Sequence, residues 1–226
     1  MKHSGDFGCG GDQETYDLGA QFIARDSREA TLILTNNTDK PLSVRLPAAF
    51  AAIPVLAQGA LLAPAAPGRT TGPGSKQPNQ PLGSNTQNKR PGQRQGLFDI
   101  PPERIVKLKV PAVCLEFGYA EPNMHVRYVI EPIEQYTSDP ELQEVCKLLG
   151  TDKIDQQVAQ AAAWHLANHL SWEKLAEMKH FPHNSGFTRP VFTQDQIRAA
   201  MQLTDKAIKA ADARLAEATP RSSGGG

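Results

Sequence analysis

The spacing of the hydrophobic residues changes once along the chain, near Glu131, and this change limits the possible folds most. Before it, apolar and polar residues alternate, as in the segment PLSVRLP at 41–47. This period of two is typical of half-buried strands. After it, apolar residues recur every three or four positions, which is typical of amphipathic helices. Strands followed by helices predict an α+β fold.

Short apolar segments in the first half predict about six or seven strands. Two of them, at 30–36 and 41–47, flank an Asn-, Asp- and Pro-rich turn and predict a hairpin. This number of short strands is typical of an immunoglobulin-like domain. We therefore expect an antiparallel immunoglobulin-like β-sandwich over residues 15–132. The other expected strands lie at 21–24, 48–56, 104–110, 112–119 and 124–130.

The second half predicts a small α-helical subdomain over residues 137–218. Its central helix, at 155–168, is rich in alanine and has little polar surface, so we expect the helices to pack on the sandwich. Residues typical of helix starts precede each helical segment. These residues are Ser138 or Asp139 with Pro140, Thr151 or Asp152, Ser171, and Thr193 with Gln196.

One segment inside the strand-rich half has a different composition. Residues 63–96 contain six prolines and five basic residues, with no acidic residue and few large apolar ones. Such a segment buries too little surface to offset the entropy of ordering it. We expect residues 63–98 to be a disordered insertion in the sandwich, and residues 1–14 and 219–226 to be disordered ends.

Charge and hydropathy exclude two classes of partner. Lys plus Arg and Asp plus Glu both number 24, so no net charge favours specific nucleic-acid binding. No apolar run is long enough for a transmembrane segment. The first residues lack the apolar stretch of a signal peptide. We expect a cytoplasmic protein, or an extracellular or envelope protein whose leader is missing from this chain.

Three cysteines are too few for a disulfide framework, although one bridge between Cys114 and Cys146 stays open for an exported protein. Two short motifs are of more chemical interest. The segment VCL at 113–115 lies in an expected strand, and AQAAAW at 159–164 lies in the alanine-rich helix. Together they resemble the thioester domains of bacterial surface adhesins. In that family, a strand cysteine is joined to the glutamine of a helix motif, Thr-Gln-x-Ala-apolar-Trp. This chain has Ala159 where the family has threonine.

The resemblance implies a thioester between Cys114 and Gln160, shielded from water by Trp164. It would act as a covalent trap for a nucleophile on a host or neighbouring surface. The residues also permit a purely structural interpretation. In that case Cys114 is a small buried apolar residue, Gln160 is a surface amide and Trp164 fills the core.

Four histidines lie within 19 residues and form the second candidate site. His165 and His169 are one helical turn apart, and His180 and His183 follow in an expected loop. Imidazoles in this number can bind zinc or a similar metal. The helix lacks the glutamate of a zinc protease motif, and His165 also fits a buried packing role.

No spacing of carboxylates, nucleophiles and bases indicates catalysis, so we assign no catalytic residues and expect no cofactor. The sequence favours a non-catalytic structural or interaction module of the bacterial envelope or exterior, with a protein or polymer surface as its partner. The alternatives are an adhesin-like domain with a Cys114–Gln160 thioester and a histidine-ligated metal protein.

Overall fold

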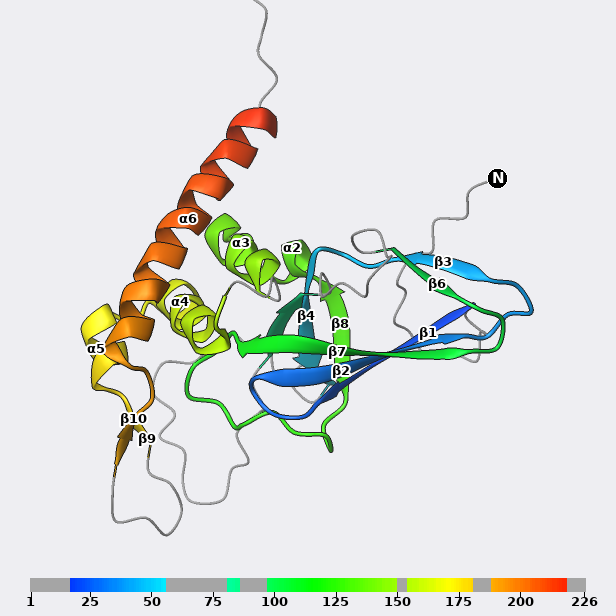
Figure 1. Ribbon diagram of the computed structural model, residues 1–226, viewed down its shortest axis with the longest axis horizontal. Helices are drawn as coiled ribbons and strands as arrows, with labels where there is room; N and C mark the ends of the chain where they lie inside the picture. The colour runs from blue at the N-terminus through cyan, green and yellow to red at the C-terminus, as the bar shows by residue number, and fades with distance from the viewer. Residues whose placement is uncertain (1–16, 56–80, 86–96, 150–153, 181–187, 219–226) are drawn as a thin grey trace, which may run out of the picture.

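The computed structural model describes residues 17–55, 81–85, 97–149, 154–180 and 188–218, and the predicted disordered ends lie outside these ranges. Six antiparallel strands form a closed barrel in the order β1-β2-β7-β5-β4-β8, and a layer of helices follows (Figure 1). The barrel strands are β1 (Leu18–Ala24), β2 (Glu29–Asn36), β4 (Ala49–Pro54), β5 (Leu82–Asn85), β7 (Ile105–Cys114) and β8 (Tyr128–Pro132).

The closed barrel shows that the predicted immunoglobulin-like sandwich is wrong. The closure of the barrel depends on β7. This strand pairs with β2 as far as Pro111 and with β5 from Ala112 onward. Pro111 does not divide this segment into two strands, because it lies where the pairing partner changes. On the other side, β8 pairs with β4 and also with β1, through Tyr128 and Phe22.

The predicted hairpin of residues 30–36 with 41–47 is also wrong. β2 pairs with β1 and β7, whereas β3 (Leu42–Arg45) forms a separate two-stranded sheet with β6 (Leu97–Ile100). The turn between β2 and β3 is folded around the buried side chain of Asn36. Its Nδ2 donates to the carbonyl oxygens of Lys40, Ile100 and Pro101, so the turn is attached to the end of β6.

β5 lies within the segment 63–98 that composition predicted to be disordered. Its only large apolar residue, Leu82, is fully buried in the barrel. The other side of the strand needs small residues, because the helices approach closely there. A side chain at Gly83 would have its Cβ only 2.7 Å from Sγ of Cys146 and 2.9 Å from Cδ2 of Leu115.

The helices are α2 (Ile133–Tyr136), α3 (Pro140–Leu148), α4 (Gln156–Asn168), α5 (Trp172–Glu177) and α6 (Gln194–Ala218). All of them except α2 begin at a residue whose side chain caps the helix. Asp139 accepts hydrogen bonds from two backbone N–H groups of α3, Ser171 caps α5, and Thr193 and Gln196 form the predicted capping box of α6. The cap of α4 is Asp155, whereas the expected caps Thr151 and Asp152 lie outside the described residues.

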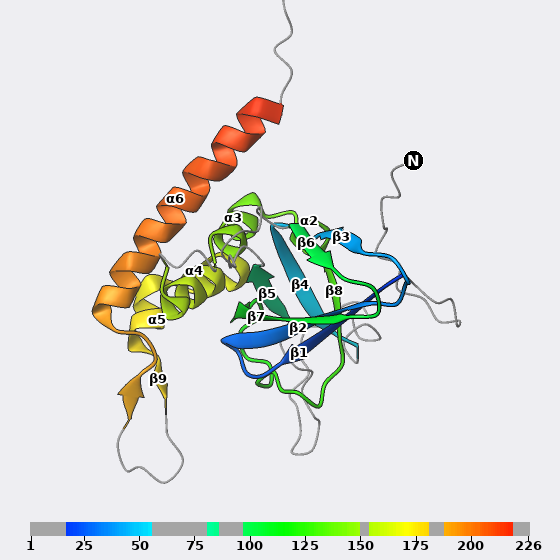
Figure 2. The same cartoon turned by 45° about the vertical axis from the view of Figure 1, so that its right-hand side comes forward.

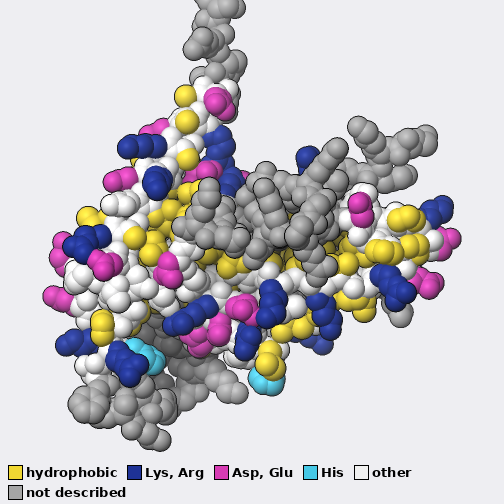
Figure 3. Space-filling model, viewed as in Figure 1, with side chains coloured by type: hydrophobic (Ala, Val, Ile, Leu, Met, Phe, Trp, Pro, Cys, Tyr) yellow, Lys and Arg dark blue, Asp and Glu magenta, His cyan; other side chains and the backbone are white. Residues whose placement is uncertain are grey.

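The helical layer covers the outer face of β4, β5 and β7, as the two ribbon views show (Figures 1 and 2). Val113 and Leu115 belong to this helix–barrel core, whereas Ala112 and Cys114 belong to the core inside the barrel. α6 has a row of residues at helical spacing along one side, and only some of them are buried. Ile197, Thr204 and Ala211 are buried, but three residues at seven-residue spacing are exposed, namely Met201, Ile208 and Leu215. Apolar side chains are accordingly visible at the surface along α6 (Figure 3).

A short hairpin of β9 (Lys179–His180) and β10 (Arg189–Pro190) connects α5 to α6. None of the helices in the described ranges is both long and apolar enough to cross a membrane.

The close approach at Gly83 makes a testable prediction about packing. Gly83→Ala should lower the free energy of unfolding by about 1–3 kcal/mol, because the new methyl group overlaps the sulfur of Cys146. Cys146→Ala removes that sulfur and leaves a cavity instead. In chemical denaturation, the double variant should therefore lose less stability than the sum of the two single variants. Additive losses would contradict this packing.

Candidate functional site

The candidate site begins where one edge of β7 loses its strand partner. The first residue of β2, Glu29, pairs with Pro111, so Ala112, Val113 and Cys114 extend beyond β2. The backbone N–H of Ala112 still donates to the carbonyl oxygen of Arg28, at 2.7 Å. The next polar backbone groups of this edge have no strand to pair with. A buried edge needs other partners for them.

Two glutamines of α4 provide those partners. Gln156 donates through Nε2 to the carbonyl oxygen of Ala112 at 2.9 Å. Gln160 makes two bonds to Cys114: Oε1 accepts from its backbone N–H at 2.8 Å, and Nε2 donates to its carbonyl oxygen at 2.9 Å. The Gln160 side chain therefore replaces a neighbouring strand residue. It is buried, with 5% of its surface exposed, so it is not the surface amide of the structural interpretation.

The thiol of Cys114 lies in the apolar interior of the barrel, since Cys114 shares the core of Phe22, Phe50 and Tyr128. Burial, with smaller contributions from the nearby negative charges of Glu121 and Asp26, raises the pKa of this thiol far above its ordinary value. At neutral pH the group is therefore protonated and weakly nucleophilic. The contact with Gln160 is made by the backbone of Cys114.

Trp164 lies one further turn along the same face of α4 and packs against both apolar cores. Its ring makes edge contacts with Phe117 and Phe192, with centroids 5.1 Å and 5.9 Å apart. Phe117 is fixed in turn, because its backbone N–H donates to Oδ1 of Asn168 at 3.0 Å. These rings form an apolar group beside the end of β7.

The structure does not bring the candidate metal ligands together. Nδ1 of His165 lies 2.8 Å from the carbonyl oxygen of Leu170, and its ring stacks on Trp172 with centroids 4.0 Å apart. His169 ends α4, and the exposed His180 lies in β9. His183 lies outside the described residues. Within the described ranges, no three His, Cys, Asp or Glu side chains are arranged to hold a metal ion.

Cys114 and Cys146 are both buried and free. They belong to different apolar cores, with Cys114 inside the barrel and Cys146 between the barrel and the helices. The bridge that the sequence left open is therefore not formed. Burial raises the pKa of the Cys146 thiol to about 12, so this group too stays protonated near neutral pH.

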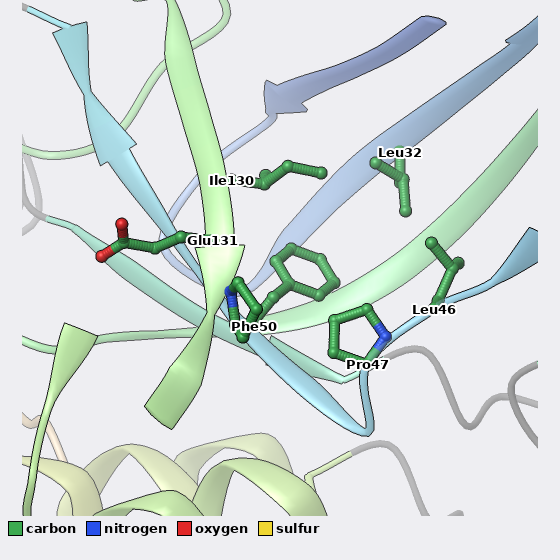
Figure 4. Close-up of a pocket in the computed structure, with 7 residues that line it drawn as sticks. Leu32, Leu46, Pro47, Phe50, Ile130 and Glu131 are labelled. Carbon is green, nitrogen blue, oxygen red and sulfur yellow. The ribbon is translucent and has the colours of Figure 1, made fainter. Parts of the chain in front are cut away.

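An apolar hollow lies elsewhere, at the end of the barrel near β4 and β8. Leu32, Leu46, Pro47, Phe50 and Ile130 line it, and Glu131 points away from it (Figure 4). Its void is about 10 Å³. This is roughly the space that one water molecule occupies, so the hollow is a small gap in the packing.

Sequence reasoning missed Gln156 as a member of the site. The available signal was the four-residue spacing of Gln156 and Gln160, which places both amides on one helix face. Comparisons of this chain with protein-family models, with curated proteins and with solved structures gave no match.

Proposed function

We propose that this chain is an interaction module of the bacterial envelope or exterior, and that Cys114 and Gln160 form an internal thioester through which it attaches to a partner. One observation carries this proposal. Residues 46 positions apart, singled out by two short motifs, lie in direct contact, with the Gln160 carboxamide against the Cys114 backbone. The resemblance to adhesin thioester domains supplies the chemistry.

The reaction joins Sγ of Cys114 to Cδ of Gln160 and releases one ammonia, which carries away the thiol proton. Negative charge develops on Oε1 of Gln160 during the attack. The backbone N–H of Cys114, 2.8 Å from Oε1, is placed to stabilise that charge. The thiol must first rotate from the barrel interior toward the strand edge. The raised pKa of the thiol makes its attack slow, but the Gln160 carboxamide is held against the Cys114 backbone and the two groups need react only once.

The thioester then reacts with a nucleophile of the partner. An amine attacks the carbonyl carbon, a new amide joins the partner to Gln160, and the Cys114 thiol is regenerated. Trp164 and Phe117 limit the access of water, which would otherwise hydrolyse the bond. This sequence gives covalent attachment without turnover.

A small amine tests the proposal. Fresh protein incubated with methylamine should gain about 14 Da over the mass calculated from its sequence, because a methylamide replaces the amide of Gln160. Peptide mapping should locate the change at Gln160. Cys114→Ala should prevent it. Modification of several glutamines, or of none, in the unaltered protein would contradict the proposal.

A second candidate is a module that binds its partner without a covalent bond. The protonated state of Cys114 and the satisfied hydrogen bonds of Gln160 favour it. Its contact surface would include Phe117 and Tyr119, which are 39% and 41% exposed, since aromatic side chains are enriched at interfaces. Thiol counting after unfolding separates the candidates. All three cysteines react with an alkylating agent if no thioester exists, but only two react at first if it does.

A further inference from the structure

We propose that Gln156 is a positioning residue: it sets the register of α4 along β7, so that the Gln160 carbonyl meets Cys114. This inference rests on the proposed function, because it explains how Gln160 is aligned for the reaction. Gln156 itself contacts neither the thiol nor the amide of the reacting pair in the described contacts. Its role is exerted through the helix.

The spacing of helix and strand supports this role. Residues four apart on a helix are separated by about 6 Å along its axis. Residues two apart on a strand are separated by about 6.6–6.8 Å. Gln156 and Gln160 can therefore bond to Ala112 and Cys114 at the same time. The three bonds, of 2.8–2.9 Å, show that they do.

The alanines on the apolar side of α4 contribute little to setting this register. The buried residues of α4 facing the barrel and the other helices include Ala159, Ala161, Ala162 and Ala163. A shift of the helix by one turn would replace one methyl group with another at many of these contacts. Directional hydrogen bonds distinguish such registers, because a shift would remove their partners.

Gln156 also connects α4 to the turn between β1 and β2. Its Nε2 lies 3.5 Å from the carbonyl oxygen of Ser27, beside its bond to Ala112. The same turn contacts Gln157, whose oxygen accepts from Nε and Nη2 of Arg28 once its amide is oriented to satisfy both groups. Gln156 donates a hydrogen bond to β7, whereas the described side-chain hydrogen bonds of Gln157 are with the turn alone. Gln157 is therefore a suitable control for changes at Gln156.

In the described contacts, the side-chain oxygen of Gln156 makes no bond that could hold the side chain in place. Its position therefore depends on the hydrogen bonds that Nε2 donates. Within the described part of the chain, Oε1 of Gln156 has no hydrogen-bond partner. An apolar residue would avoid the penalty of burying that oxygen. It would also remove the one donor that holds the helix to the Ala112 carbonyl.

The experiment compares Gln156→Ala and Gln156→Glu with the control Gln157→Ala. Glutamate keeps the shape of glutamine but loses the donor. Two quantities are followed: the rate of ammonia loss by intact mass, and hydrogen exchange of the Cys114 amide. Both Gln156 variants should form the thioester about tenfold more slowly and exchange the Cys114 amide about tenfold faster, a factor typical of one hydrogen bond. The control should match the unaltered protein in both.

The two readouts separate the possible failures. Faster exchange in the Gln156 variants, with no ammonia loss even in the unaltered protein, would refute the thioester and retain the positioning role. Unchanged exchange and unchanged ammonia loss in the Gln156 variants would overturn the positioning role. Equal effects of Gln157→Ala would also overturn it, because they would show general loosening of the helix.

Discussion

Replacing Gln160 by alanine in a Cys114→Ala background is expected to lower the free energy of unfolding by about 3 kcal/mol or more. In that background no thioester can form, so the loss measures the hydrogen bonds alone. The substitution leaves the N–H and the carbonyl oxygen of residue 114 buried without partners. Each unsatisfied buried group costs about 1–3 kcal/mol. Urea denaturation of the two proteins measures the difference.

Cys114→Ala alone serves as the control for this prediction. It removes one sulfur from the barrel interior but leaves the backbone groups that Gln160 binds. We expect this single change to cost clearly less than the subsequent loss of Gln160. If Cys114→Ala instead accounted for most of the lost stability, the packing of the thiol would matter more than the contact between Gln160 and the backbone.

Asn36→Ala should be the second most damaging of the changes considered, lowering the free energy of unfolding by about 3 kcal/mol. The side chain is 1% exposed. Its Nδ2 donates to three carbonyl oxygens, and its Oδ1 accepts from the N–H and hydroxyl of Thr38 at 2.9 and 2.7 Å. Alanine would leave several of these groups without partners. Thermal and urea unfolding measure the effect.

Two further variants test the same network. Asn36→Asp keeps the acceptor but places a negative charge against three carbonyl oxygens, so it should cost at least as much as alanine. Asp39→Ala changes an exposed residue of the same turn and should alter the stability by less than about 0.5 kcal/mol. A tolerated Asn36→Asp would show that the donor bonds contribute little.

The starts of α3, α5 and α6 could be predicted because their signals are local. Asp139, Ser171 and Thr193 each cap a helix whose first residues follow directly in the sequence. The order of strands followed by helices was likewise readable from hydrophobic spacing. These features depend on residues a few positions apart, so a single sequence contains them.

The arrangement of the strands could not be predicted in the same way. Alternation in β2 and β7 gives each strand one buried face, and this holds in a sandwich and in a barrel alike. Closure depends on long-range pairs such as Phe22 with Tyr128 and Leu82 with Cys114. β5 carries one large apolar residue, so its sequence has no strand pattern. It fits in the barrel because Gly83 leaves room for the side chain of Cys146, which is distant in the sequence.

The candidate site was only partly accessible from the sequence. The helical periodicity of α4 did not require Gln160 to face inward, and only the motif singled it out. Gln156 escaped notice because its partner, the Ala112 carbonyl, belongs to an edge of β7 that lacks a strand partner only beyond the first residue of β2. The placement of the thiol inside the barrel also depends on which face of β7 forms its interior.

The intact mass of freshly purified protein tests the central claim most directly. The thioester predicts a mass lower by one ammonia, about 17 Da, than the mass calculated from the sequence. Cys114→Ala and Gln160→Ala should each restore the calculated mass for their own sequences. The calculated mass in the fresh, unaltered protein would contradict the account and leave non-covalent binding as the function of this module.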